Sequence, residues 1–208
     1  MTRVDGPEPG RVQLALDGRW LEFPVHDDVD VRRWSRRLVD EALAAREVTA
    51  PKAQRKAYAD MYAQLLAVLR STADEPDMKL MSAYCYVPDT DLLYAALVKL
   101  VALALPLDST IDDAVSSLVT APAARYGEER ITELETAGGR CVRIQQLLLD
   151  DAGGADSGVT SSLSYVWATE EDSVFLVLVT TFASPVEGAL HEEALDELAA
   201  TLTKGAGV

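Results

Sequence analysis

Residues 130–149, with the sequence RITELETAGGRCVRIQQLLL, contain two stretches of strand-forming residues separated by a Gly-Gly dipeptide at positions 138–139. Two glycines between such stretches are typical of a two-residue hairpin turn. A turn at this dipeptide pairs Glu135 with Val142 and places Arg140 diagonal to Glu135, within reach of an ion pair. The stretch therefore predicts an antiparallel hairpin in the second half of the chain.

The residues after this hairpin predict a second strand pair and a closing helix. Residues 163–167 and 173–182 are rich in β-branched and aromatic side chains, which favour strands. Residues 184–187, Ser-Pro-Val-Glu, match a capping box with a proline just inside it, which is typical of a helix start. We expect the helix to bury one apolar stripe, formed by Leu190, Ala194, Leu195, Leu198 and Leu202.

The first third of the chain predicts a short hairpin and two helices. Residues 12–16 and 20–23 are apolar strands with an Asp-Gly turn dipeptide between them. Asp28 or Asp30 is placed to cap the first helix, and Pro51 suits the first turn of the second. The apolar positions that we expect to be buried are Val31, Trp34, Leu38, Ala42 and Ala45 in the first helix and Ala57, Met61, Leu65, Val68 and Leu69 in the second.

The middle of the chain predicts two further strands and a short helix. Residues 79–87 alternate in character and include strand-favouring aromatic side chains. Leu92–Leu105 is almost continuously apolar, which indicates a central buried strand, with a buried helix as the alternative at this length. An Asp-Ser-Thr sequence at residues 108–110 begins a short helix that ends near Thr120.

Together these elements predict an α+β fold. We expect a mostly antiparallel sheet of about six to seven strands flanked by helices, as in an α/β/α sandwich. Residues 1–10 are expected to be a disordered leader and residues 11–204 a single domain, in which residues 48–77 could be a helical insertion. A chain of 208 residues can bury an adequate core without disulfides.

Four segments carry a resemblance to a known family: Ala-Gly-Gly-Arg-Cys-Val-Arg at residues 137–143, Leu-Ser-Tyr-Val-Trp at residues 163–167, the strand at residues 174–182, and Ser-Pro at residues 184–185 before the last helix. Their order resembles the PsbP-like family of α/β/α proteins, especially its small actinobacterial members, over residues 12–40 and 130–203. That family includes photosystem subunits, a nuclear-transport cofactor and lipoproteins. The resemblance implies a non-enzymatic adaptor or accessory role in a bacterial protein.

Charge is unevenly distributed along the chain. The net charge is −15, and Ile144–Thr203 contains eleven carboxylates but no lysine or arginine. Nucleic-acid binding depends on cations that neutralise phosphates, so the acidic second half argues against a nucleic-acid partner. The acidity suits a basic protein partner or simple solubility. The apolar segments are too short or too charged for a membrane span, and residues 1–11 do not form a secretory signal, so we expect a cytoplasmic protein.

Catalytic residue types do not fall into a recognisable motif. The chain has two histidines, His26 and His191, and neither accompanies a nucleophile elbow or a phosphate-binding glycine loop. His26 could hold a divalent cation together with Asp27, Asp28 and Asp30, although helix capping is the favoured interpretation.

Two further features favour structural roles over chemistry. The aspartates Asp150, Asp151 and Asp156 faintly resemble a calcium-binding loop, but a mobile loop is the favoured interpretation. Cys85 and Cys141 lie within apolar runs, which is typical of buried thiols, and a disulfide between them stays open. We therefore expect no metal and no cofactor; whether the chain is an enzyme is left open, with a non-enzymatic role favoured.

Three sets of side chains are candidates for partner binding. The acids of the last helix, Glu192, Glu193, Asp196 and Glu197, are expected to share its outward face. Arg33 and Arg37 lie near a helix start, where the helix dipole disfavours cations, so an acidic surface of this protein or of a partner must offset them. Aromatic residues on strands could line a groove, although packing under helices is the favoured interpretation; they are Tyr84, Tyr86, Tyr165 and Trp167.

The leading functional hypothesis is a non-catalytic protein-interaction or accessory module that binds a partner, such as a basic protein, through the acidic last helix. An immunity or inhibitor protein for a basic toxin is the first alternative, because acidic surfaces accelerate association with basic proteins. A carboxylate- or metal-dependent hydrolase is the second. A homo-oligomer is compatible with each of these hypotheses.

Overall fold

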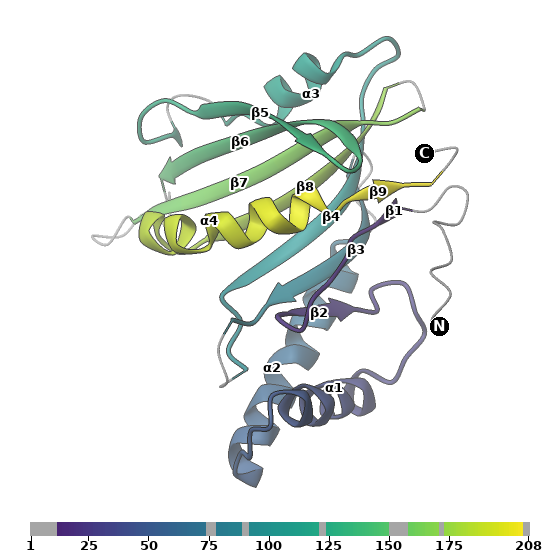
Figure 1. Ribbon diagram of the computed structural model, residues 1–208, viewed down its shortest axis with the longest axis vertical. Coiled ribbons are helices and arrows are strands. Elements are labelled where there is room, and N and C mark those ends of the chain that lie inside the picture. Colours follow the sequence, from purple (N-terminus) through teal and green to yellow (C-terminus); the bar gives the residue numbers. More distant parts are fainter. Residues whose placement is uncertain are drawn as a thin grey trace. The chain divides into compact units, whose positions relative to one another are not determined.

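An antiparallel sheet of seven strands, flanked by helices, forms the predicted α+β fold (Figure 1). The computed structural model describes residues 12–73, 78–88, 92–120, 124–149, 158–170 and 173–205. The strand order is β2-β3-β4-β8-β7-β6-β5, and β1 and β9 form a separate two-stranded sheet. The chain divides within β4 into two units: Leu16–Val101, here called the helical unit, and Met1–Ala15 with Ala102–Val208, here called the sheet unit.

The helical unit contains α1 (Val31–Ala45), α2 (Lys52–Ser71), β2 (Trp20–Phe23), β3 (Met78–Tyr86) and most of β4 (Ala96–Ala104). Strands β2 and β3 pair antiparallel. Asp30, one of the two predicted candidates, caps α1. Its carboxylate accepts a hydrogen bond of 2.8 Å from the Arg33 backbone N–H. The strand predicted within Leu92–Leu105 is confirmed by β4, and the alternative of a buried helix is wrong.

The buried faces of α1 and α2 match the predicted ones only in part: Trp34, Ala42 and Leu69 are buried as predicted, and the other predicted positions are not. The residues that these helices bury are Trp34, Ser35, Val39, Ala42 and Leu43 in α1 and Tyr58, Ala59, Tyr62, Leu66 and Leu69 in α2. Tyr62 packs its ring 6.1 Å from that of Phe23 and donates its hydroxyl to the carbonyl of Leu92 at 2.9 Å. The two tyrosines of α2 turn inward, and Val68, predicted to be buried, is therefore 60% exposed.

The sheet unit contains four consecutive antiparallel strands and two helices. The strands are β5 (Arg130–Thr136), β6 (Gly139–Leu149), β7 (Val159–Ala168) and β8 (Val174–Phe182), and the helices are α3 (Ile111–Leu118) and α4 (Pro185–Ala200). The predicted second strand pair is confirmed by β7 and β8. The predicted hairpin of residues 12–16 and 20–23 is wrong, because β1 (Val12–Gln13) pairs with β9 (Thr203–Lys204) and β2 pairs with β3.

Helices α3 and α4 lie on opposite faces of β5–β8. Successive side chains of a strand point to opposite faces, and neighbouring residues of β6 contact different helices. Arg143 and Gln145 contact carboxylates of α4. The side-chain amide of Gln146 instead accepts a hydrogen bond from the N–H of Thr120 and donates one to the carbonyl of Leu118, at the end of α3. Figure 1 shows α4 lying across β7 and β8, which agrees with an α/β/α layering.

The β5–β6 hairpin forms in a register two residues away from the predicted one. Glu135 lies opposite Arg140 instead of Val142, and the turn consists of Ala137 and Gly138. Gly139 begins β6 at φ +96°, a conformation that glycine adopts without a steric penalty. The N–H of Ala137 donates to the carbonyl of Ala200, so the turn is held by the end of α4, a long-range contact absent from the local sequence signal.

Candidate functional site

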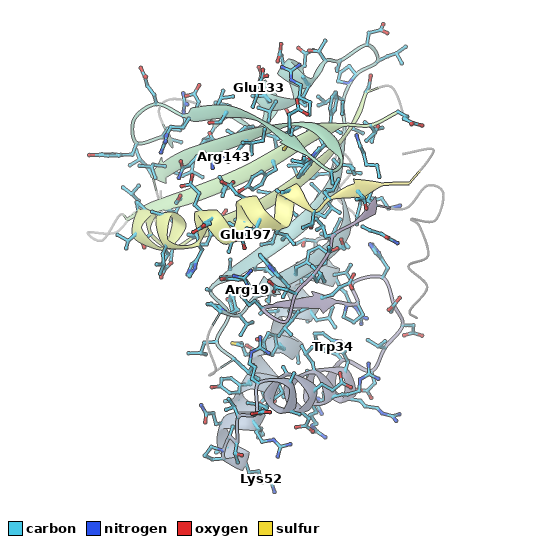
Figure 2. All side chains as sticks on the ribbon, in the orientation of Figure 1. Arg19, Trp34, Lys52, Glu133, Arg143 and Glu197 are labelled. Atoms are coloured by element: carbon cyan, nitrogen blue, oxygen red, sulfur yellow. The ribbon has the colours of Figure 1, made fainter. Side chains whose placement is uncertain are left out.

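The four acids of α4 do not share one outward face, which corrects the prediction. Glu192 and Asp196 turn towards the sheet, where Nη1 of Arg143 lies 2.8 Å from Glu192 Oε1 and 2.7 Å from Asp196 Oδ2. Arg143 is labelled in Figure 2. The hydroxyl of Tyr165 donates a hydrogen bond of 2.6 Å to the other oxygen of Asp196. The side-chain amide of Gln145 donates to Glu192 at 3.3 Å. Arg143, Tyr165, Glu192 and Asp196 are called the inner cluster below.

The inner cluster is a partly buried charge network. The side chain of Arg143 is 11% exposed, and burial opposes its charge, yet the hydrogen bond and attraction from Asp196 raise its pKa above the ordinary value. Burial, reinforced by the hydrogen bond to Asp196, raises the pKa of Tyr165, so its phenol stays protonated and can donate. These contacts assign Glu192 and Asp196 to attachment of α4 to the sheet.

The opposite face of α4 carries a mixed apolar and acidic stripe. Val186 and Leu190 are 77% and 72% exposed, and Glu193 and Glu197 are also exposed. At 3.6 residues per turn, these four positions fall within about 60° of one another around the helix. They are called the outer stripe below. Ala194, Leu195, Leu198 and Leu202 are buried as predicted, but the prediction that Leu190 is buried is wrong.

The sequence around α4 fixes the orientation of the outer stripe. Ser184 begins the helix as predicted, its hydroxyl accepting a hydrogen bond of 3.2 Å from the N–H of Glu187. Gly188 permits a close approach to β7, because a Cβ at this position would lie 2.6 Å from Ser161 Oγ. With Leu195 fully buried on the same face, the helix cannot rotate without losing core contacts. The outer stripe is thus presented on a firmly attached helix.

Arg33 and Arg37 are exposed on α1, in the helical unit, whereas the acids of α4 belong to the sheet unit. Both arginines line a hollow of about 470 Å³ together with Val29, Asp30 and Trp34. Arg37 also lies 3.7 Å from Glu41, one helical turn away. Such an exposed pair contributes little to stability, so the guanidinium group of Arg37 can contact other molecules.

The four aromatic candidates do not line an open groove, because all of them are buried. Tyr84 and Tyr86 belong to the helical unit, where the ring of Tyr86 packs 4.8 Å from that of Trp20. Tyr165 and Trp167 lie side by side in the sheet unit, with ring centroids 6.2 Å apart. The indole N–H of Trp167 donates to the hydroxyl of Thr136 at 2.9 Å. These residues stabilise the two cores, as the favoured interpretation predicts.

A basic cleft between α1 and α2 was not identified from the sequence. It has a volume of about 420 Å³ and is lined by Arg36, Val39, Asp40, Lys52, Arg55, Lys56, Ala59 and Asp60. The sequence did contain an indication of this cleft, because basic residues are concentrated in both helices. The convergence of the two helix surfaces, however, depends on how the helices pack.

Within the described ranges, no group of three histidine, cysteine, aspartate or glutamate residues is arranged to hold a metal ion. The predicted calcium-like positions Asp150, Asp151 and Asp156 lie outside those ranges, as does the predicted leader at residues 1–10. Cys85 and Cys141 are buried free thiols, so they do not form the disulfide that the sequence left open. Of the helices that the structure describes, none has the length and apolar character of a membrane span.

Comparisons with protein-family models, curated proteins and solved structures give no match to this chain.

Proposed function

We propose that this chain is a non-catalytic accessory protein that binds another protein through the outer stripe of α4. The observation that carries the proposal is the exposure of Val186 and Leu190, one helical turn apart, beside Glu193 and Glu197. Exposed apolar side chains that are adjacent and bordered by charge are typical of protein-interaction surfaces. The PsbP-like resemblance implies the same kind of role and supports the proposal.

The partner that fits this stripe has an apolar contact bordered by lysine or arginine. Residues 102–208 contain eighteen carboxylates and five cations, so the sheet unit attracts a basic protein over a distance. Such attraction raises the association rate and is weakened by salt. We place this binding in the cytoplasm, as the sequence predicts.

A second candidate function rests on the same charge. An immunity or inhibitor protein for a basic toxin would use the acidity of the sheet unit to capture the toxin rapidly. Deletion of the gene would then be harmful only in cells that also express the toxin. Equal growth of the deletion strain with and without every neighbouring gene would contradict this candidate and leave the accessory role.

A photo-crosslinking amino acid at position 190 tests the accessory role. Irradiation in lysate of the producing organism should attach one defined protein to the chain, because position 190 lies within the proposed contact. The matched control places the crosslinker at Val68 of α2, which is also apolar and 60% exposed. Competition by excess unlabelled chain should abolish the adduct at position 190. The same adducts at both positions, or none that is competed, would contradict the proposal.

A further inference from the structure

The pair of helices α1 and α2 is strongly basic within an acidic protein. Residues 31–71 contain nine lysine or arginine residues and four carboxylates, whereas the rest of the chain contains ten and thirty. A basic region of this kind attracts anions even though the net charge of the chain is −15. The basic cleft between the two helices, described above, concentrates this charge in one hollow.

The basic cleft contains both paired and unpaired cations. Arg55 forms an ion pair with Asp40, and Lys56 lies 2.5 Å from Asp60. Across the described residues, no ion pair involves Arg36 or Lys52, the other two cations of the cleft. Lys52 is the first residue of α2 (Figure 2). Two positive charges of the same hollow therefore lack an anion.

We propose that the basic cleft binds the phosphate group of a small phosphate monoester. A phosphate dianion matches the two unpaired charges, with the planar guanidinium of Arg36 suited to two of its oxygens and the ammonium of Lys52 to a third. The volume of about 420 Å³ falls in the range of small-molecule sites and exceeds what a phosphate group alone fills. Asp40 and Asp60 supply acceptors for hydroxyl groups on the remainder of the ligand.

The same carboxylates argue for a small ligand over a nucleic acid. A polyanion that extends along the helices would bring further phosphates close to Asp40 and Asp60, which repel them. Nucleic-acid binding also requires many cations without intervening acids, and two of the four cations in this cleft are already neutralised. A single phosphate in the hollow that Arg36 and Lys52 line would leave both existing ion pairs intact, because those pairs use other cations.

Titration of the full chain with inorganic phosphate, glycerol 3-phosphate and glucose 6-phosphate, followed by amide chemical shifts, tests the proposal. Chloride should keep the ionic strength constant. We expect saturable shifts confined to residues around positions 36–40 and 52–60, with the esters binding more tightly than inorganic phosphate because of their hydroxyl contacts. Shifts that do not saturate, or equal affinities for all three compounds, would overturn it.

Variants separate a built site from general attraction. Arg36→Gln combined with Lys52→Gln should weaken ester binding by about 10-fold or more, because charge-assisted hydrogen bonds are lost. Arg32→Gln, which removes an exposed cation of the same helix outside the cleft, should change the affinity less than about 2-fold. Asp40→Asn should strengthen binding, because it removes a repulsive charge and releases Arg55. Equal effects of Arg32→Gln and of the combined Arg36→Gln and Lys52→Gln variant would overturn the proposal.

This site lies in the helical unit and is independent of the outer stripe of α4, so either proposal can fail without the other.

Discussion

At the scale of single residues, Arg143 is a polar side chain that links α4 to the sheet. It contacts both Glu192 and Asp196 while its own side chain is only 11% exposed. Removal of one member of a poorly hydrated ion pair is costly because the remaining charges lose their partner without regaining full hydration. We therefore expect the loss of Arg143 to lower the stability of the protein clearly, whereas the loss of an ordinary surface salt bridge changes stability little.

We expect Arg143→Met to lower the free energy of unfolding by about 2–3 kcal/mol. This loss is smaller than that for a fully buried ion pair, because the cluster is partly solvated. Arg140→Met is the matched control, because the ion pair of Arg140 with Glu133 is exposed, and it should leave the urea midpoint of unfolding almost unchanged. Urea unfolding followed by tryptophan fluorescence and circular dichroism measures both. Similar losses in the two variants would contradict an inward role for Glu192 and Asp196.

The two thiols are expected to be chemically inert in the folded protein. Burial raises the pKa of Cys85, and burial raises that of Cys141 to about 12. The thiolate is the reactive form, so very little of it is present at pH 8. A disulfide reagent should label neither cysteine in native buffer and both in concentrated urea. Rapid native labelling of either cysteine would show that its strand opens or that its burial is incomplete.

At the scale of elements, Gly188 lets α4 lie close to β7. In most helices glycine to alanine is stabilising by up to about 1 kcal/mol. Here a Cβ would lie 2.6 Å from Ser161 Oγ and 2.8 Å from Ser161 Cβ, so the helix or the strand would have to move. We expect Gly188→Ala to cost about 1–3 kcal/mol despite its better helix propensity.

Gly18→Ala provides the control for this prediction. No atom lies within 4 Å of a Cβ at Gly18, so the substitution should be close to neutral. Thermal unfolding of both variants measures the difference. A Gly188→Ala variant as stable as the original chain would mean that α4 can shift on the sheet, and the orientation of the outer stripe would then be uncertain.

Leu190 and Leu195 provide a direct comparison of the two faces of α4. Leu195 is fully buried, so Leu195→Ala should cost about 2–5 kcal/mol through lost packing and the cavity left behind. Leu190→Ala should change stability by no more than about 0.5 kcal/mol, because its side chain is already in solvent. Chemical unfolding distinguishes the two, and a large cost at Leu190 would restore the buried stripe predicted from the sequence.

The sequence predicted elements better than their orientations, for identifiable physical reasons. Helix starts at Asp30 and Ser184 follow from local hydrogen bonds; Ser184 was predicted, and Asp30 was one of two predicted candidates. The register of the β5–β6 hairpin was wrong because Ala137 is held by the end of α4. The predicted inward face of α2 was wrong except at Leu69, because tyrosines, which apolar periodicity undervalues, fill its core side.

At the scale of the whole molecule, charge counts predicted an acidic surface. They did not predict which acids of α4 contact the sheet and which face solvent. Glu192 and Glu193 are neighbours in sequence, yet one contacts Arg143 and the other faces solvent. The packing of Gly188 and Leu195 against the sheet, together with the position of Arg143, decides which acid turns inward. The basic cleft was missed for a related reason, since its residues belong to two helices and converge only when those helices pack.

This division changes what a charge-reversal experiment can show. Reversal of all four acids of α4 would break the inner cluster and confuse loss of stability with loss of binding. Reversal of Glu193 and Glu197 alone leaves Arg143 with its partners. Glu128→Lys with Glu135→Lys is a control of equal charge change at exposed positions in the same unit.

The central claim is that the outer stripe of α4 binds a partner protein. Its most direct test is the affinity of the purified chain for the protein identified by crosslinking at position 190, measured at low and high salt. The account predicts that Glu193→Lys with Glu197→Lys weakens binding by roughly 10-fold or more at low salt and removes most of its salt dependence. The control pair should retain both the affinity and the salt dependence to within about 3-fold. Indistinguishable affinities and salt dependences for the two charge-reversed proteins would contradict the outer stripe of α4 as the binding surface.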